Sequence, residues 1–151
     1  PEMREYRAGV RARLREVAAS DPENALRLRA LENSDKPHRI RPRSEGPPEA
    51  DGYPAVTGPS AGANGDDGYI RSDGSPGPGT GSIIYYDPEL SVEGGSRGAG
   101  TPAGILAHEA AGHGYDRDQG LLDDSIGPTG STGTEESGKA AERRHIRGQN
   151  R

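Results

Sequence analysis

The sequence predicts a small α+β domain, and three patterns lead to that expectation. Apolar residues near the N-terminus recur at steps of three and four, as on one face of a helix. A β-branched and aromatic run over residues 82–86 is typical of a strand. Thr101-Pro102 is typical of the start of a further helix. With 151 residues, we expect one domain over residues 1–151.

The chain is poor in residues that fill a hydrophobic core. Leu, Ile and Val supply 19 of 151 residues, and Phe and Trp are absent, below the roughly one-fifth share of ordinary globular chains. The net charge of −5 is modest, so composition does not predict wholesale disorder. We therefore expect a small core with long loops, and a bound metal ion can stabilise such a domain.

Cysteine is absent, which excludes disulfides and thiolate metal sites. Any metal ion must therefore bind to His and carboxylate side chains. No run of the sequence reaches transmembrane length, and we expect no signal peptide. The scattered Arg residues form no basic face, so we expect neither a membrane nor a nucleic-acid partner. Because the chain opens at Pro1 without Met, an excised domain or a processed product is expected.

Residues 1–33 are predicted to form a helical hairpin. The second helix opens at the capping-box pattern Ser20-Asp21-Pro22-Glu23 and ends near Asn33, with Ala25, Leu26, Leu28 and Leu31 available for burial. The first helix buries one apolar face, made of Met3, Tyr6, Val10, Leu14 and Val17.

The middle of the chain is predicted to be mostly irregular. A short strand is expected at His38–Arg41, before Pro42. Residues 44–82 contain 10 Gly and 6 Pro in 39 residues, so residues 44–81 are expected to be a Gly/Pro-rich loop. Tyr69-Ile70 is the one brief extended piece expected within it.

Residues 82–147 are predicted to carry the chemistry. Ser82–Tyr86 is the clearest strand, with Tyr85 or Tyr86 in the core, and the helix that opens at Thr101 follows. Residues 116–133 are expected to be a Gly/Ser/Thr-rich loop. Thr134 then caps a last helix from Glu135 to about Ile146.

The hexapeptide His108-Glu109-Ala110-Ala111-Gly112-His113 contains the parts of a zinc hydrolase, two imidazole ligands and a carboxylate base. Its spacing, HExxxH, is one residue longer than the usual HExxH. In a regular α-helix, residues five apart differ by about 140° around the axis, so the two rings would diverge. A π-bulge absorbs one extra residue and restores a shared face. Gly112 and Gly114 are expected to lower the conformational free energy that this distortion costs.

The third metal ligand must come from elsewhere in the chain. We favour Glu136, with Glu135 as a hydrogen-bond partner to an imidazole N–H. Asp116 and Asp118 are the second choice for this ligand. For both of them, as for Asp123 and Asp124, the favoured interpretation is nevertheless a solvated loop carboxylate. For His38 the favoured interpretation is a surface position.

The chain also resembles the NleD-like effector metallopeptidases, a family of zinc endopeptidases delivered by bacteria and also found as toxin domains. The resemblance covers residues 79–147. The residues that carry it are Gly79-Thr80-Gly81 and the strand through Asp87-Pro88, then Gly94-Gly95, Thr101-Pro102, Ile105 to Glu109, Thr134-Glu135-Glu136, Glu142 and Ile146-Arg147. Members of that family carry HExxH. The dipeptidyl peptidase III-like enzymes use HEXXGH with a later Glu-Glu pair, and HEAAGH with Glu135-Glu136 in this chain is similar to that pattern.

The resemblance implies a small zincin-like metallopeptidase domain with a helical hairpin, a small sheet, an active-site helix and a glutamate-bearing C-terminal helix. It implies Zn²⁺ bound by His108, His113 and Glu136, with zinc-activated water and Glu109 as general base.

Candidates for stabilising the oxyanion are Tyr115 and His145. Arg143 is placed nearer the site than His145, because it shares a helix face with Glu136.

The implied biology is a secreted or translocated effector or toxin that cleaves a target protein. A host signalling kinase is one such target, and an immunity or delivery partner is compatible with this role. Two alternatives stay open: a catalytically degenerate module that binds metal or another protein, and a metal hydrolase of small amides.

Overall fold

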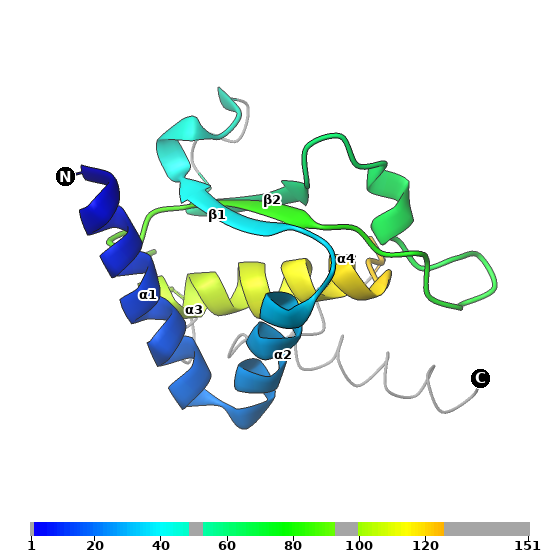
Figure 1. Cartoon of the computed structure of the whole chain (residues 1–151), viewed down its shortest axis with the longest axis horizontal. Coiled ribbons are helices and arrows are strands. Elements are labelled where there is room, and N and C mark those ends of the chain that lie inside the picture. The colour runs from blue at the N-terminus through cyan, green and yellow to red at the C-terminus, as the bar shows by residue number, and fades with distance from the viewer. Residues whose placement is uncertain (1, 49–52, 93–99, 126–151) are drawn as a thin grey trace.

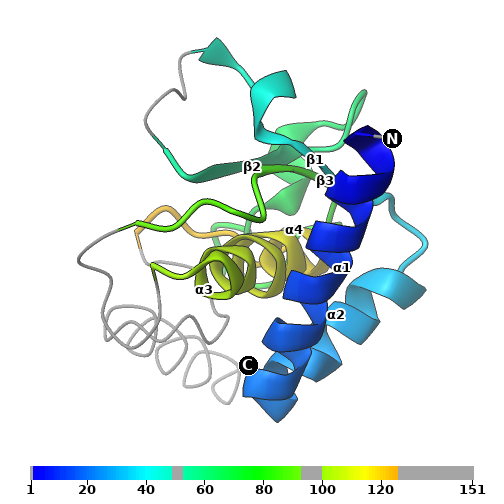
Figure 2. The same cartoon turned by 90° about the vertical axis from the view of Figure 1, so that its left-hand side faces the viewer.

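A three-stranded sheet covers three helices in the computed structural model, which describes residues 2–48, 53–92 and 100–125 (Figure 1). The view turned by 90° shows the sheet above the helix of residues 102–119, with the N-terminal helix alongside (Figure 2). This part of the chain is therefore a small α+β domain, as predicted. None of its helices combines the length and the apolar character needed to cross a bilayer.

The N-terminal hairpin consists of α1 (Glu2–Ser20) and α2 (Pro22–Asn33), which confirms that prediction. Val10 and Val17 are buried, and the Tyr6 hydroxyl donates a hydrogen bond of 2.9 Å to the carbonyl of Tyr86, which ties α1 to the sheet. The residue that caps α2 is Asp21, whose carboxylate accepts the backbone N–H of Glu23 at 2.8 Å.

Two details of the predicted hairpin were wrong. Ser20 is the last residue of α1, and its hydroxyl donates to the carbonyl of Val17 at 2.7 Å instead of capping α2. Leu26 is 61% exposed, because it lies on the face of α2 that is turned away from the core.

The central strand of the sheet is β3 (Ser82–Tyr86), with β1 (His38–Pro42) parallel on one side and β2 (Ala55–Pro59) antiparallel on the other. The strands predicted at His38–Arg41 and Ser82–Tyr86 are thus confirmed. Residues Ser82, Ile84 and Tyr86 alternate along β3 as buried positions, so their side chains belong to the core side of the sheet.

The prediction of an irregular loop over residues 44–81 was wrong in part. Residues 44–81 contain β2 and a 3₁₀ turn at Gly65–Gly68. The local sequence of β2 ends in Gly58-Pro59, which disfavours a strand, but β2 lies at the sheet edge, where proline is tolerated. Its pairing with β3 therefore decides its conformation. The extended piece predicted at Tyr69 is confirmed as a bridge to Leu122.

The third helix is continuous through α3 (Pro102–Leu106), a π-helical segment (Ala107–Gly114) and α4 (Tyr115–Gln119). The predicted loop at residues 116–133 was therefore wrong at its start. The helix ends where Gly120 takes a left-handed conformation with φ of 69°, which glycine adopts at no steric cost. Asp116 and Asp118 lie on α4 and are 0% and 6% exposed, so they are not solvated loop carboxylates.

The core lies between the sheet and the third helix. Tyr86 and Leu106 are both fully buried there, and Ile105 of α3 is also buried. The Tyr86 hydroxyl donates to the carbonyl of Pro102 at 2.5 Å, which fixes the start of α3 against the end of β3. This contact confirms the core position predicted for Tyr86.

Replacing Thr101 by alanine is expected to lower the free energy of unfolding by about 1 kcal/mol. The Thr101 hydroxyl caps α3 by accepting the backbone N–H of Gly104 at 3.0 Å, as the sequence predicted. Urea unfolding followed by circular dichroism measures the change, and Thr101→Ser, which keeps the hydroxyl, is the control. Equal losses in both variants would contradict the capping role.

Candidate metal centre

The π-helical segment brings the two histidines of the hexapeptide together. The Nε2 atoms of His108 and His113 lie 3.1 Å apart, and the ring centroids are 4.7 Å apart with the ring planes at 83°. Because a π-helix is bonded from residue i to i+5, residues five apart share a face. The predicted distortion is therefore confirmed, but it extends over the eight residues Ala107–Gly114 instead of a single bulge.

The separation of these nitrogens fits two ligands of one zinc ion. Zinc–nitrogen bonds of about 2.05 Å at a tetrahedral angle place two ligand nitrogens about 3.3 Å apart. The observed 3.1 Å is within a few tenths of an ångström of that value. Two imidazole nitrogens form a donor set that suits zinc and several other transition metals.

Glu109 completes the cluster of potential metal-binding groups. One ligand atom from each of His108, Glu109 and His113 lies within 4.8 Å of the others. Glu109 is 8% exposed, and its Oε2 accepts a short hydrogen bond from the hydroxyl of Thr57 on β2. Burial raises the pKa of Glu109 above its ordinary value of 4.5, and the hydrogen bond from Thr57 opposes this in part.

Helix α2 braces the π-helical segment through Arg27. Its guanidinium donates to the carbonyl of Ala111 at 3.4 Å, lies 4.4 Å from the centroid of the Tyr115 ring and pairs with Glu23 at 3.0 Å. Gly114 contributes less to the π-helical distortion than the sequence suggested. Its conformation is helical, with φ of −61°, and an added Cβ would make only ordinary van der Waals contacts.

A cavity of about 400 Å³ opens beside the cluster. The edge strand β2 forms one wall and the third helix forms the other. The cavity is lined by Pro47, Tyr53, Ala55, Val56, Thr57, Glu109, His113 and Arg117. A substrate in this cavity would therefore contact both the candidate base and one candidate ligand.

The other predicted site residues fall into three groups. Glu135, Glu136, Arg143 and His145 lie outside the described residues. The Tyr115 ring lies against Arg27 and does not line the cavity. Asp116 and Asp118 are buried on α4, and neither belongs to the cluster of His108, Glu109 and His113 that the described part of the chain forms.

A buried polar network that the sequence did not indicate lies behind the π-helical segment. The ring of His38 is hydrogen-bonded through Nδ1 to the Ser82 hydroxyl at 2.7 Å and through Nε2 to the Asp118 carboxylate at 2.8 Å. Asp118 also accepts from Ser34, at short distance, and from Gln119 at 2.8 Å. The surface position predicted for His38 was wrong, since its side chain is 9% exposed.

This network is structural. Ser82 is 1% exposed within the central strand, so a substrate cannot reach its hydroxyl. His38 and Ser82 are partners in the β1–β3 register, and Asp118 on α4 is hydrogen-bonded to His38. The network therefore joins the sheet to the end of the third helix. No local motif marks it, because the two ends of the His38–Asp118 hydrogen bond are 80 residues apart.

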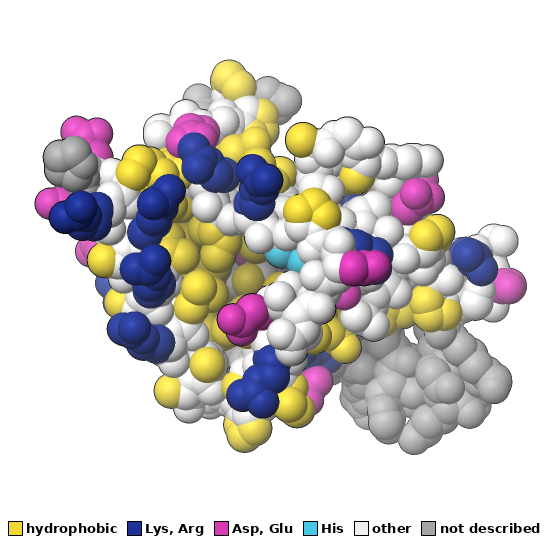
Figure 3. All heavy atoms as spheres, in the orientation of Figure 1, with side chains coloured by type: hydrophobic (Ala, Val, Ile, Leu, Met, Phe, Trp, Pro, Cys, Tyr) yellow, Lys and Arg dark blue, Asp and Glu magenta, His cyan; other side chains and the backbone are white. Residues whose placement is uncertain are grey.

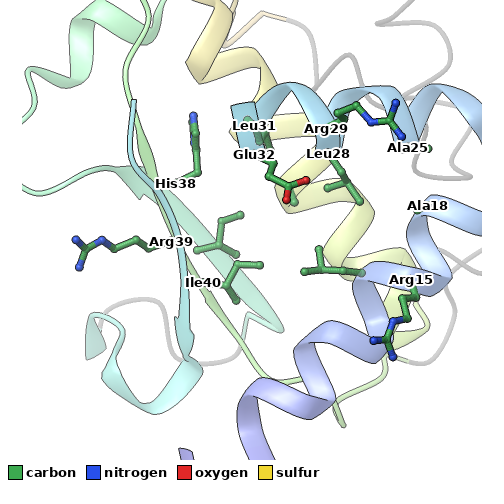
Figure 4. A pocket seen from close by; sticks show the side chains of 13 residues that line it. Arg15, Ala18, Ala25, Leu28, Arg29, Leu31, Glu32, His38, Arg39 and Ile40 are labelled. Atoms are coloured by element: carbon green, nitrogen blue, oxygen red, sulfur yellow. The ribbon is translucent and has the colours of Figure 1, made fainter. Parts of the chain in front are cut away.

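A second cavity, of about 540 Å³, lies between the hairpin and the β1 side of the sheet. Leu28, Leu31 and Ile40 extend toward its interior, whereas Arg29 and Arg39 extend away from it (Figure 4). The space-filling view shows a hollow with a hydrophobic floor and basic side chains along its border (Figure 3). Its lining brings no cluster of metal ligands together, so the candidate site is the smaller cavity.

Comparisons of the chain with family models, with curated proteins and with solved structures find no match. The case for a function therefore depends on the geometry around His108, Glu109 and His113.

Proposed function

We propose that this chain is a zinc-dependent endopeptidase domain. The observation that carries the proposal is the convergence of His108 Nε2 and His113 Nε2 to 3.1 Å, next to the buried carboxylate of Glu109. Two convergent imidazoles and an adjacent carboxylate are what metal-assisted hydrolysis of an amide requires.

Three protein ligands are proposed for the zinc ion, as is usual for hydrolytic zinc sites. His108 and His113 supply two nitrogens from one face of the π-helical segment. Glu136 is proposed as the third ligand, delivered from the part of the chain that follows residue 125.

Glu109 is proposed as the general base. When bound, zinc would acidify water and polarise the scissile carbonyl. Oε2 of Glu109 accepts a hydrogen bond from Thr57, so Oε1 is the oxygen left to accept a proton from water and then to deliver it to the leaving amine. Thr57 thereby orients the carboxylate, and its place on an edge strand couples the base to the wall of the cavity.

A zincin-like architecture is proposed for the domain. Two features support it: the helix that carries the histidines packs against one face of the sheet, and the edge strand β2 borders the cavity above that helix. The resemblance to the NleD-like effector metallopeptidases extends the proposal to a secreted or translocated effector or toxin with a protein substrate. A host signalling kinase as substrate and an immunity or delivery partner belong to that extended proposal.

Zinc binding tests the proposal. The metal-free chain is incubated with one equivalent of zinc and desalted, and its zinc content is measured by mass spectrometry. We expect about one ion per chain for the unmodified protein and almost none for His108→Ala or His113→Ala, because each removes a ligand. Wild-type zinc content in both histidine variants would overturn the proposal.

A matched pair of variants tests the third ligand. Glu136→Ala is expected to lose zinc, whereas Glu135→Ala, one residue away with the same change in charge, is expected to keep it. Zinc-edge X-ray absorption on the unmodified protein then estimates the number of imidazole ligands from scattering by the outer atoms of their rings. Loss of zinc in Glu135→Ala and its retention in Glu136→Ala would assign the third ligand to Glu135.

A further inference from the structure

We infer that Arg117 binds a carboxylate of the substrate in the cavity beside His113. The site would then take peptides that carry a carboxylate close to the scissile bond. This inference rests on the proposed function, because it names the substrate class of the same cavity.

Arg117 is placed at the cavity by the third helix. It lies four residues after His113, where the helix has returned to α geometry, so the two residues share one face. Both line the cavity together with Glu109. Arg117 is therefore part of the same cavity wall as the candidate base and one candidate metal ligand.

Two of the three guanidinium nitrogens of Arg117 are buried without a hydrogen-bond acceptor among the described residues. The residue is 8% exposed, and its Nε and Nη1 atoms make no hydrogen bond within residues 2–48, 53–92 and 100–125. Its neighbour Asp118 is engaged instead with Ser34 and His38. A buried guanidinium stays charged, and these two nitrogens carry three N–H donors, so leaving them without an acceptor is costly.

Within the part of the chain that the structure describes, packing and not an ion pair holds Arg117 in place. A Cβ added to Gly68 would come within 3.0 Å of Arg117 Cγ and 3.3 Å of Nη1, so the side chain fits against this glycine. The backbone carbonyl of Arg117 accepts the N–H of Thr80 at 2.8 Å. These contacts hold the backbone of Arg117 and restrict its side chain, which lowers the entropic cost of binding an anion.

A carboxylate is the anion that a peptide substrate offers to such a fork of donors. Its two oxygens match two parallel N–H groups of arginine. It can come from the C-terminus of the substrate, and the zinc hydrolase would then remove terminal residues, contrary to the endopeptidase activity proposed above. It can also come from an Asp or Glu side chain, which is compatible with cleavage inside a chain.

Small probes distinguish these two sources. The full chain, with and without zinc, is titrated with N-acetylalanine, N-acetylglutamate α-amide and the neutral N-acetylalanine amide, while the Nε–Hε signal of Arg117 is followed by NMR. We expect at least one acid to shift this signal and to bind about ten-fold or more tightly than the neutral amide. N-Acetylalanine as the tighter acid assigns a terminal carboxylate, and N-acetylglutamate α-amide as the tighter acid assigns a side chain.

Variants show whether Arg117 is responsible. Arg117→Met is expected to remove the preference for the acid, whereas Arg39→Met, at an exposed arginine on β1, is expected to keep it. If Arg117→Met does not fold, Arg117→Lys replaces it. Lysine keeps the charge but loses the paired donors, so this variant is expected to bind the acid more weakly than the wild type, in which the acid shifts the Arg117 signal.

The result also separates this inference from the proposed function. Equal binding of acids and amide by a chain that takes up zinc overturns the inference alone. Acid binding at Arg117 in a chain that takes up no zinc overturns the proposed function alone, and leaves an anion site without hydrolysis.

Discussion

Replacing Glu109 by glutamine is expected to abolish peptide-bond cleavage while the chain keeps its zinc. Glutamine has the size and shape of glutamate but cannot accept a proton from water at Oε1. Loss of a general base costs about 10² to 10⁴ in rate. The variant should keep its fold, since its side-chain oxygen can still accept the hydrogen bond that Thr57 donates to Oε2.

The measurement pairs two readouts on the same sample. Cleavage of fluorescein-labelled, denatured casein reports the rate, and the zinc content reports the metal site. Glu32→Gln, at an exposed glutamate of α2, makes the same chemical change away from the cavity and should leave both readouts unchanged. Cleavage at the wild-type rate by Glu109→Gln would contradict the role of Glu109 as base. A wild-type chain that binds zinc but cleaves neither casein nor short blocked peptides would favour the catalytically degenerate alternative.

Replacing Asp118 by alanine is expected to lower the free energy of unfolding by about 3 kcal/mol or more. The carboxylate accepts hydrogen bonds from Ser34, His38 and Gln119 at a site where its own exposure is 6%. Removing it leaves the donor groups of Ser34 and His38 buried without their acceptor. Loss of one partner in such a network costs far more than loss of a surface pair.

Urea unfolding at neutral pH measures this loss. Asp35→Ala is the matched control, because the Asp35 side chain is 93% exposed and its ion pair with Lys36, at 3.5 Å, is a surface pair. We expect a change within about 0.5 kcal/mol for the control. Equal effects of the two substitutions would show that the network contributes little.

The stability that Asp118 contributes is expected to disappear in acid. Burial by itself would raise its pKa, but the hydrogen bonds from Ser34, His38 and Gln119 outweigh burial and hold the pKa below its ordinary value of 3.8. A carboxyl group with a lowered folded-state pKa stabilises the protein fully above its unfolded value, and this contribution is lost as the pH falls through the folded value.

Unfolding measured from pH 5 downward tests this dependence. The difference in stability between the wild type and Asp118→Asn should shrink as the pH falls below 3.8, because the wild-type carboxylate then becomes protonated. A difference that stays constant over this range would contradict the lowered pKa.

The helices and the central strand could be predicted because their signals are local. The spacing of Val10 and Val17 marks the buried face of α1, and Thr101-Pro102 marks the start of α3. The insertion in HExxxH also predicted a π-type distortion, since only that geometry puts residues five apart on one face. Each of these inferences depends on residues within a few positions of one another.

The third ligand could not be tested in the same way. Glu136 and its neighbour Glu135 lie outside the described residues. Their assignment depends on residue type and on the resemblance, and it stays a prediction that the zinc measurements decide.

By itself, the sequence determined the two helices of the hairpin, the strand Ser82–Tyr86 and the pairing of His108 with His113 across a distorted helix. Only the tertiary structure decided that the Gly/Pro-rich middle contributes an edge strand, that His38 meets Asp118 in the interior and that Arg117 is buried beside the cavity. The physical reason is range. Backbone propensity and helical periodicity act over a few residues, whereas strand pairing and burial of polar groups depend on partners that are distant in the sequence and approach only when the chain folds.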